Sequence, residues 1–257
     1  MAEVLFYERP VPLNRNAHKD LRLKPIPNMK FALDAHSVPL TGVEFALAAR
    51  DMPIVFAGND LASAGPVALL GLRQNENLFV DANGQWLPGA YVPAFVRRYP
   101  FVLAEKPAGQ EGDDFAVFLD EGYEGFNATE GDRLFNEDGS DTEMLSRAVG
   151  FLGEFQQHVA RTRWFMDQLR KHDLLESRNI SMRKGTPDGQ GQVINLNGMF
   201  VVNEEKLRQL DEKTAQEFVR EGVLGWIYAH LISMNNLDRL GQRLGEREDG
   251  EVGASRN

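Results

Sequence analysis

The sequence predicts an α+β protein with a strand-rich N-terminal half and a helix-rich C-terminal half that carries one additional hairpin. Short apolar segments separated by Gly, Asn and Pro fill residues 43–119, as is typical of strands. From about residue 140, apolar residues instead recur at helical spacing. Because strands and helices occupy separate stretches, an α+β fold is favoured over a doubly wound sheet.

The first half contains short extended elements. Residues 1–40 include five prolines and read as short strands and connections. Strands are expected at 53–57, 67–72, 78–80, 101–104 and 115–119, with a polar connection at 106–114. The segment Asp81-Ala-Asn-Gly84 predicts a hairpin turn that leads into Trp86, because Asn-Gly readily adopts positive φ.

The second half begins at Ser140-Asp-Thr-Glu143, which predicts a capping box with Ser140 as the N-cap. The helix that follows runs to about Arg161, and a second helical piece through Leu169 continues it or follows a bend. A hairpin is expected between 180–182 and 193–202, around a glycine-rich turn at 185–191. The remaining expected elements are a short helix capped by Asn203, another at 214–220, and one long helix at 222–240.

We expect a single domain over residues 1–244, with any subdivision near 140. Residues 245–257 lack an apolar anchor and are expected to form a flexible tail.

The net charge of −10 is concentrated in one stretch of the 257-residue chain. Thirteen acidic residues lie between Glu105 and Glu143, opposed only by Lys106 and Arg133. This balance excludes a typical nucleic-acid binder, which would present a basic face. No apolar run reaches the roughly 18 residues that a membrane span needs.

Two further features bear on the compartment. The N-terminus has no conventional signal peptide, so we expect a soluble, cytoplasmic protein, with surface association by a non-classical route as the alternative. The chain has no cysteine, which rules out disulfides and thiolate metal sites.

The principal candidate site is Arg97 and Arg98, which lie inside the apolar run Tyr91–Ala104. A guanidinium keeps its charge on burial and therefore needs a partner. In an extended segment one arginine would point inward and the other outward. With Tyr99 and Trp86, they form either a ligand site for a carboxylate or phosphate, or a structural clamp. We favour a clamp onto the acidic stretch 105–143.

Acid–base candidates are few. Asp120 and Glu121 directly follow the strand at 115–119, and His158 and His230 lie on or beside apolar helix faces. All four are expected to be structural. Phosphate-loop, dinucleotide-binding and Gly-x-Ser-x-Gly patterns are absent. We therefore predict no catalytic residue, no metal site and no cofactor.

Four stretches resemble the SapC family of bacterial proteins. They are Tyr91-Val-Pro-Ala-Phe-Val-Arg-Arg-Tyr-Pro-Phe101, Leu134-Phe-Asn-Glu-Asp-Gly139, Leu196-Asn-Gly-Met-Phe-Val-Val-Asn-Glu-Glu-Lys-Leu207 and Gly225-Trp-Ile-Tyr-Ala-His-Leu-Ile-Ser-Met-Asn235. The family, distinct from a peptide-transport permease of similar name, takes its name from a surface-layer association. Its members look like neighbours of outer-membrane uptake receptors and flavin-dependent tryptophan halogenases. The resemblance carries over no catalytic residue.

The expected function is that of a non-catalytic accessory or binding protein linked to nutrient or peptide uptake or modification. Its partner would be a protein or peptide. One alternative is an enzyme that uses an unrecognised carboxylate–histidine site, and the other is a self-associating, surface-layer-associated protein.

Overall fold

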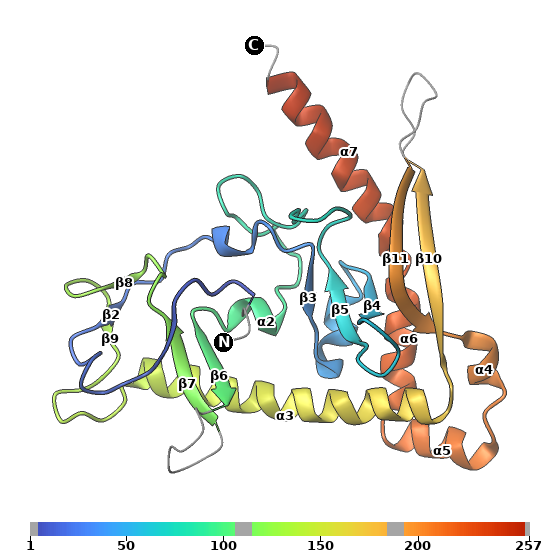
Figure 1. Cartoon of the computed structure of the whole chain (residues 1–257), viewed down its shortest axis with the longest axis horizontal. Coiled ribbons are helices and arrows are strands. Elements are labelled where there is room, and N and C mark those ends of the chain that lie inside the picture. The colour runs from blue at the N-terminus through green and yellow to red at the C-terminus, as the bar shows by residue number, and fades with distance from the viewer. Residues whose placement is uncertain (1–4, 106–114, 184–192, 255–257) are drawn as a thin grey trace. The chain divides into compact units, whose positions relative to one another are not determined.

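The computed structural model describes residues 5–105, 115–183 and 193–254 (Figure 1). The chain folds into two compact units, each assembled from two separate stretches. The first unit comprises residues 1–28 and 95–157, and the second comprises 29–94 and 158–257. Strands predominate in the N-terminal half and helices in the C-terminal half, so the α+β prediction is confirmed. No helix among the described residues is long and apolar enough to cross a membrane.

The first unit contains two small antiparallel sheets. One has the order β1–β7–β6 and the other the order β8–β2–β9. The strands are β1 (Pro10–Pro12), β2 (Arg22–Leu23), β6 (Phe101–Glu105), β7 (Phe115–Asp120), β8 (Phe126–Asn127) and β9 (Asp132–Arg133). The strands expected at 101–104 and 115–119 are confirmed as β6 and β7, which pair from Phe101↔Leu119 to Glu105↔Phe115. The connection at 106–114 lies outside the described residues.

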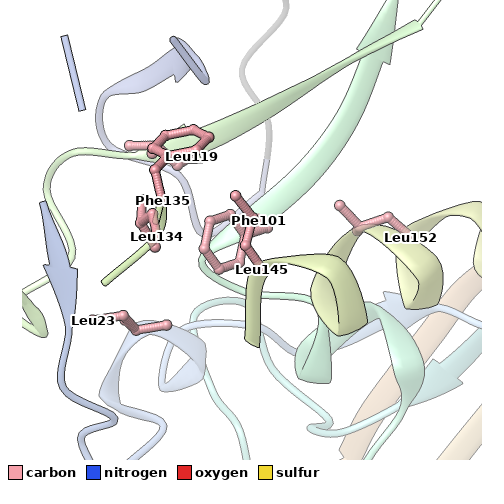
Figure 2. Packing of buried hydrophobic residues seen from close by; sticks show 7 residues of the cluster. All are labelled: Leu23, Phe101, Leu119, Leu134, Phe135, Leu145 and Leu152. Atoms are coloured by element: carbon pink, nitrogen blue, oxygen red, sulfur yellow. The ribbon is translucent and has the colours of Figure 1, made fainter. Parts of the chain in front are cut away.

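Helix α3 (Glu143–Lys171) is a single helix of 29 residues, so its two expected pieces are continuous. Leu145 and Leu152, seven residues apart, lie on the same helix face and enter the first unit's main apolar cluster. Figure 2 shows them beside Phe101 of β6. The other members come from the sheets and the segment before α3: Leu23, Leu119, Leu134 and Phe135.

The cap of α3 differs from the sequence prediction. The helix begins at Glu143, and Thr142 Oγ1 lies 3.4 Å from the backbone N–H of Leu145, which makes Thr142 the N-cap residue. The Ser140 hydroxyl instead donates to Asp138 Oδ1 at 2.6 Å. The predicted capping box at Ser140 is therefore wrong, because Ser140 belongs to the preceding turn.

The second unit contains a five-stranded antiparallel sheet with the order β10–β11–β4–β5–β3. Its strands are β3 (Ser37–Pro39), β4 (Ile54–Ala57), β5 (Gly65–Leu69), β10 (Leu175–Arg183) and β11 (Val193–Val202). The hairpin of β10 and β11 is confirmed, while its turn at 185–191 lies outside the described residues. The strand expected at 78–80 is reduced to a single bridge between Val80 and Trp86, where Gly84 adopts a φ of 81° in the turn.

Further helical segments complete the fold. They are η1 (Lys30–Ala32), η2 (Gly42–Glu44), α1 (Phe45–Ala48), α2 (Ala94–Arg97), α4 (Glu204–Arg208), α5 (Glu212–Arg220), α6 (Val223–Ser233) and α7 (Asn236–Ala254). Asn203 caps α4 as expected, because its side chain accepts from the Lys206 N–H.

The long helix expected at 222–240 is instead two helices, α6 and α7. Between them the N–H groups of Met234 and Asn235 bond three residues back, in a turn. The Asn236 side chain donates to the backbone carbonyls of Ala49 at 2.8 Å and Met52 at 3.4 Å. Asparagine favours such side-chain bonds over the helix interior, which explains the break.

Aromatic rings form much of the core of the second unit. Phe45 of α1, Phe56 of β4, Phe165 of α3 and Trp226 of α6 contact one another with centroid separations between 5.2 and 6.3 Å. Gly42 packs so closely that a Cβ there would clash with the Trp226 ring. The core therefore fixes η2 and α1 against α6.

Helix α7 extends farther than the apolar pattern indicated, because residues 245–254 are helical where we expected a flexible tail to begin. Arg247 donates to the carbonyls of Asn77 at 2.9 Å and Val80 at 2.7 Å. A polar anchor therefore takes the place of the apolar one that the sequence lacks.

Candidate functional site

The arginine pair lies on a helical turn and not on an extended segment, contrary to the sequence prediction. Ala94–Arg97 form α2, and Arg98 begins the turn that leads into β6. Arg97 is exposed and its guanidinium lies 5.1 Å from the ring centroid of Phe151. Arg98 is half-buried, so one arginine faces inward and one outward, as expected.

The Arg98 guanidinium is surrounded by aromatic rings of the first unit. It lies 3.8 Å from the ring centroid of Phe95 and 5.4 Å from that of Phe155. It also donates a hydrogen bond to the Tyr7 hydroxyl. Burial lowers the pKa of Arg98, and the interaction with Tyr7 opposes this shift. Cation–π attraction and the Tyr7 bond thus hold the charge in place.

The expected clamp of Arg98 onto the acidic stretch is not formed within the described part of the chain. There, no carboxylate lies within ion-pair distance of Arg98, and its Nε is buried without an acceptor. Acidic residues of the stretch instead pair with the N-terminal segment, as in Lys24–Glu130 at 2.5 Å and Arg15–Asp141 at 3.3 Å. Residues 106–114, which carry three more acidic groups, lie outside the described residues.

Asp120 is fully buried and accepts hydrogen bonds from four neutral donors. The backbone N–H groups of Glu8, Arg9 and Gly122 lie 2.8–3.0 Å from its oxygens, and the Tyr99 hydroxyl lies at 3.0 Å. The carboxylate thereby fastens the N-terminal segment to the end of β7. With its oxygens occupied, it has little capacity left to act on a substrate.

Tyr7 links the Arg98 cluster to the neighbouring sheet. Its hydroxyl donates to the Phe101 carbonyl at 2.7 Å, and its ring lies edge-on to Tyr99 at 5.3 Å. Burial raises the pKa of both tyrosines, so both stay neutral at physiological pH. Tyr7 is distant from the arginines in sequence, and no local pattern identified it.

Glu121 faces His18, a pairing that the sequence did not predict. Glu121 Oε1 lies 3.7 Å from His18 Nε2. His18 Nδ1 accepts from the Asn14 N–H at 3.0 Å, so Nε2 carries the ring proton and points toward Glu121. This contact brings one carboxylate and one histidine of the first unit together.

The other two acid–base candidates belong to the second unit. His230 is fully buried, and both of its ring nitrogens are bonded to backbone groups: Nε2 accepts from Val202 N–H at 3.1 Å and Nδ1 donates to the Ile54 carbonyl at 2.7 Å. Burial lowers the pKa of His230 to about 4. His158 is half-buried on α3. Asp120 and His230 thus use their polar atoms on hydrogen bonds within their own units.

Trp86 also belongs to the second unit, separate from the arginine pair with which the sequence grouped it. Its ring stacks on Phe79 with centroids 5.7 Å apart, and its Nε1 is buried without an acceptor among the described residues. The described part of the chain also contains no group of three His, Asp or Glu side chains that could hold a metal ion.

These features define an α+β protein whose most distinctive polar feature is an arginine held among aromatic side chains. The chain belongs to the SapC family, whose family model matches residues 13–240. Comparisons with curated proteins and with solved structures find no match.

Proposed function

We propose that this SapC family protein is a non-catalytic accessory protein that binds an acidic group of a partner protein or peptide at Arg97 and Arg98. The observation that carries this proposal is Arg98. Its partly exposed guanidinium is oriented by Phe95, Phe155 and Tyr7, and no carboxylate of the described residues neutralises it.

The arrangement favours binding because the cation is already held in place. A carboxylate that reaches it forms charge-assisted hydrogen bonds without first displacing an internal acidic partner from the described residues. The rings of Phe95 and Phe155 already restrict the Arg98 guanidinium before a ligand binds. Binding therefore costs little side-chain entropy. Arg97, the residue before Arg98, is exposed and adds a second positive charge.

The environments of Asp120 and His230 support a binding role over a catalytic one. Each of these groups uses its polar atoms on internal hydrogen bonds, mostly to the backbone. The cytoplasmic location and the link to uptake or modification of a peptide or nutrient stay predictions, and the ligand chemistry proposed here is compatible with both.

Calorimetric titration with a tri-glutamate peptide tests the proposal. We expect the wild-type protein to bind, and Arg98→Gln or Arg97→Ala to weaken binding about tenfold or more through loss of a charge-assisted contact. Arg147→Ala is the matched control, because it removes an exposed arginine of the same unit whose contact is with Glu143. It should bind as the wild type does.

Thermal melting separates binding from folding in this experiment. Arg97→Ala changes an exposed side chain and should melt close to the wild type even if Arg98→Gln does not. Unchanged affinity in a folded Arg97→Ala, Arg98→Gln double variant would mean that the pair is structural. Absence of binding by the wild type would contradict the proposal directly.

A second candidate function rests on the contact between His18 and Glu121. A histidine whose protonated nitrogen faces a half-exposed carboxylate is a usable acid–base pair. The alternative enzyme would then hydrolyse a small ester or phosphoester with Glu121 as the base. Turnover of such substrates by the wild type, lost in Glu121→Gln, would favour it, and equal turnover in both would rule this pair out.

A further inference from the structure

Helix α6 is built from uncharged residues on every side. It contains no Asp, Glu, Lys or Arg, and the uncharged run extends from Gly222 to Leu237. Helices of this composition are normally covered all round. One side of α6 faces the core of the second unit and is buried: Val223, Ile227, His230 and Ser233. The opposite side is open to solvent and lacks the cover that its composition predicts.

The open side of α6 carries a stripe formed by Gly225, Tyr228 and Ile232. Their spacing of three and four residues places them within about 60° of one another around the helix. Tyr228 is 47% exposed and Ile232 is 61% exposed, although both side chains are large and mostly apolar. Two more exposed apolar side chains, Val43 and Leu47, lie on η2 and α1, which pack against the same helix. Exposed apolar side chains are therefore gathered on three neighbouring elements.

The glycine in this stripe is not required by the packing of the described chain. A glycine inside a helix costs about 1 kcal/mol relative to alanine. Gly42 has an internal reason, because a Cβ there would clash with Trp226, whereas a Cβ on Gly225 would meet nothing within 4 Å. Gly150 and Gly153 of α3 are equally open, but no exposed large apolar side chain lies within a turn of either. Gly225 therefore leaves a hollow beside exposed apolar side chains, which a side chain from outside can fill.

The stripe is complementary to a second copy of itself. In an antiparallel pair of α6 helices with a two-fold axis between Tyr228 and Ala229, each residue faces the one equally far from the axis on the other helix. Ile232 then faces Gly225 of the second copy, and Tyr228 faces its Ala229. Each large side chain is opposed by a small one, which allows the helix axes to approach to about 8 Å. A parallel pair would instead place each tyrosine against the other and leave the two glycines facing each other.

Electrostatics also favour a second copy at this surface. The second unit has 18 basic and 21 acidic residues, a net charge of −3, whereas the first has 10 basic and 17 acidic residues, or −7. Because the stripe carries no charge and belongs to the less acidic unit, repulsion between two copies is small there. Antiparallel packing also brings the positive end of each helix dipole beside the negative end of the other.

We propose that α6 mediates a two-fold symmetric dimer of this chain, in which Ile232 of each copy fills the hollow at Gly225 of the other. One helix pair with its flanks buries less than the roughly 1,600 Å² of a standard interface, so we expect association in the micromolar range. The dimer is independent of the proposed function, since Arg97 and Arg98 belong to the first unit.

Sedimentation velocity of the full chain between about 1 and about 300 µM tests the dimer. We expect the wild-type protein to shift from monomer toward dimer over this range. Ile232→Glu places a charge inside the interface and should keep the chain monomeric throughout. Leu5→Glu is the matched control, because it introduces the same charge at an exposed apolar residue of the first unit. It should dimerise as the wild type does.

Gly225→Leu distinguishes the proposed packing from non-specific hydrophobic association. Leucine favours a helix more than glycine does and adds exposed apolar surface, so non-specific association should strengthen in this variant. In the proposed dimer the leucine fills the hollow that receives Ile232, and dimerisation should be lost. Thermal melting confirms that the variant is folded, since its Cβ meets no neighbouring atom within the described chain.

The absence of cysteine from the chain allows a direct test of the two-fold axis. Ala229→Cys places one thiol per chain beside the axis, where it should form a disulfide with its counterpart under mild oxidation. Gln209→Cys is the control, because it places a thiol at an exposed position of the second unit outside α6. It should cross-link at least about tenfold more slowly.

Three outcomes would overturn the inference. The first is a wild-type chain that stays monomeric at the highest concentration, and the second is undiminished dimerisation of folded Gly225→Leu. The third is equal cross-linking of the two cysteine variants, which would place any interface elsewhere. None of these results alters the titration with tri-glutamate, so this inference and the proposed function can fail separately.

Discussion

Ile54 of β4 has both of its backbone groups bonded to side chains of helix α6. Its carbonyl accepts from His230 Nδ1, and its N–H donates to the Ser233 hydroxyl at 2.9 Å. The pairing of β4 with β11 ends at Phe200↔Phe56. Two residues farther along β11, the Val202 N–H donates to His230 Nε2. The imidazole thus replaces a ladder hydrogen bond where the two strands separate.

This role makes folding stability depend on pH. Burial lowers the pKa of His230 from 6.5 to about 4, so the unfolded chain binds the proton more tightly than the folded one. Stability is therefore full above pH 6.5 and declines as the pH falls toward 4. We expect a loss of about 2 kcal/mol between pH 7 and pH 5 from this group. Urea unfolding at both values measures it.

His230→Gln is the variant that isolates this contribution. It will be less stable at pH 7, because glutamine cannot reproduce both backbone bonds and the contact with the Phe56 ring. The wild type should lose about 2 kcal/mol more free energy of unfolding between pH 7 and pH 5 than this variant does. An equal pH dependence in both proteins would show that His230 is not the titrating group.

Two buried carboxylates, Asp120 and Glu44, are stabilised by neutral donors. Glu44 accepts from the backbone N–H groups of Thr41 and Ala94 and from the hydroxyls of Thr41 and Tyr91, at 2.7–3.0 Å. Asp120 has four donors of the same kinds. Backbone donors carry no sequence signature, which is why residue types alone did not reveal which groups bind either carboxylate.

Asp120→Asn should therefore be strongly destabilising. The amide nitrogen of asparagine cannot accept from the N–H groups that bind the carboxylate, so at least one donor is left buried and unsatisfied. We expect a loss of about 3 kcal/mol in the free energy of unfolding. Glu143→Gln removes the same charge at an exposed position of the same unit and should change stability by about 0.5 kcal/mol or less. Comparable effects of the two substitutions would contradict this account.

At the scale of elements, hydrophobic periodicity predicted most strands and helices but not their ends. The sheet strands alternate or are continuously apolar, and α3 keeps its spacing across both expected pieces, so these follow from local pattern. Which hydroxyl caps α3 was not decided locally, since Ser140 and Thr142 both precede the first turn. Thr142 becomes the N-cap because its hydroxyl is also held by the Arg133 carbonyl, to which it donates at 2.8 Å. That contact is made outside the helix.

The C-terminal part of α7 is likewise stabilised by tertiary hydrogen bonds. Arg247→Gln removes the donors to Asn77 and Val80, and the last described turns should then open more often. Amide hydrogens of residues 247–250 should exchange about tenfold faster than in the wild type. Glu246→Gln, an exposed change on the same turn, should leave the exchange rates unaltered. Equal rates in both variants would mean that helix propensity alone holds this segment.

At the scale of the whole molecule, each unit combines an early and a later stretch of the chain. β1 pairs with β7 in the first unit, and β11 pairs with β4 in the second. Composition changes near residue 140, but the division between units does not coincide with that change. Pairings between distant strands depend on tertiary contacts that a local pattern does not encode.

The same reason limits how much of the candidate site the sequence could predict. Arg97 and Arg98 were found because charge in an apolar run is locally visible. Tyr7 and Phe155 were missed because they reach Arg98 only through the fold. Trp86 was grouped with the arginine pair by nearness in sequence, whereas the structure assigns it to the other unit.

The bonds from α6 to Ile54 also bear on the order of events during synthesis. His230 and Ser233 follow Ile54 by 176 and 179 residues, so β4 leaves the ribosome long before its partners exist. Until then the backbone N–H and C=O groups of Ile54 that bind α6 are exposed to water and to other chains. Such unpaired strand groups can pair with another chain and start aggregation. A nascent chain that stalls before α6 should therefore be a natural client for a chaperone.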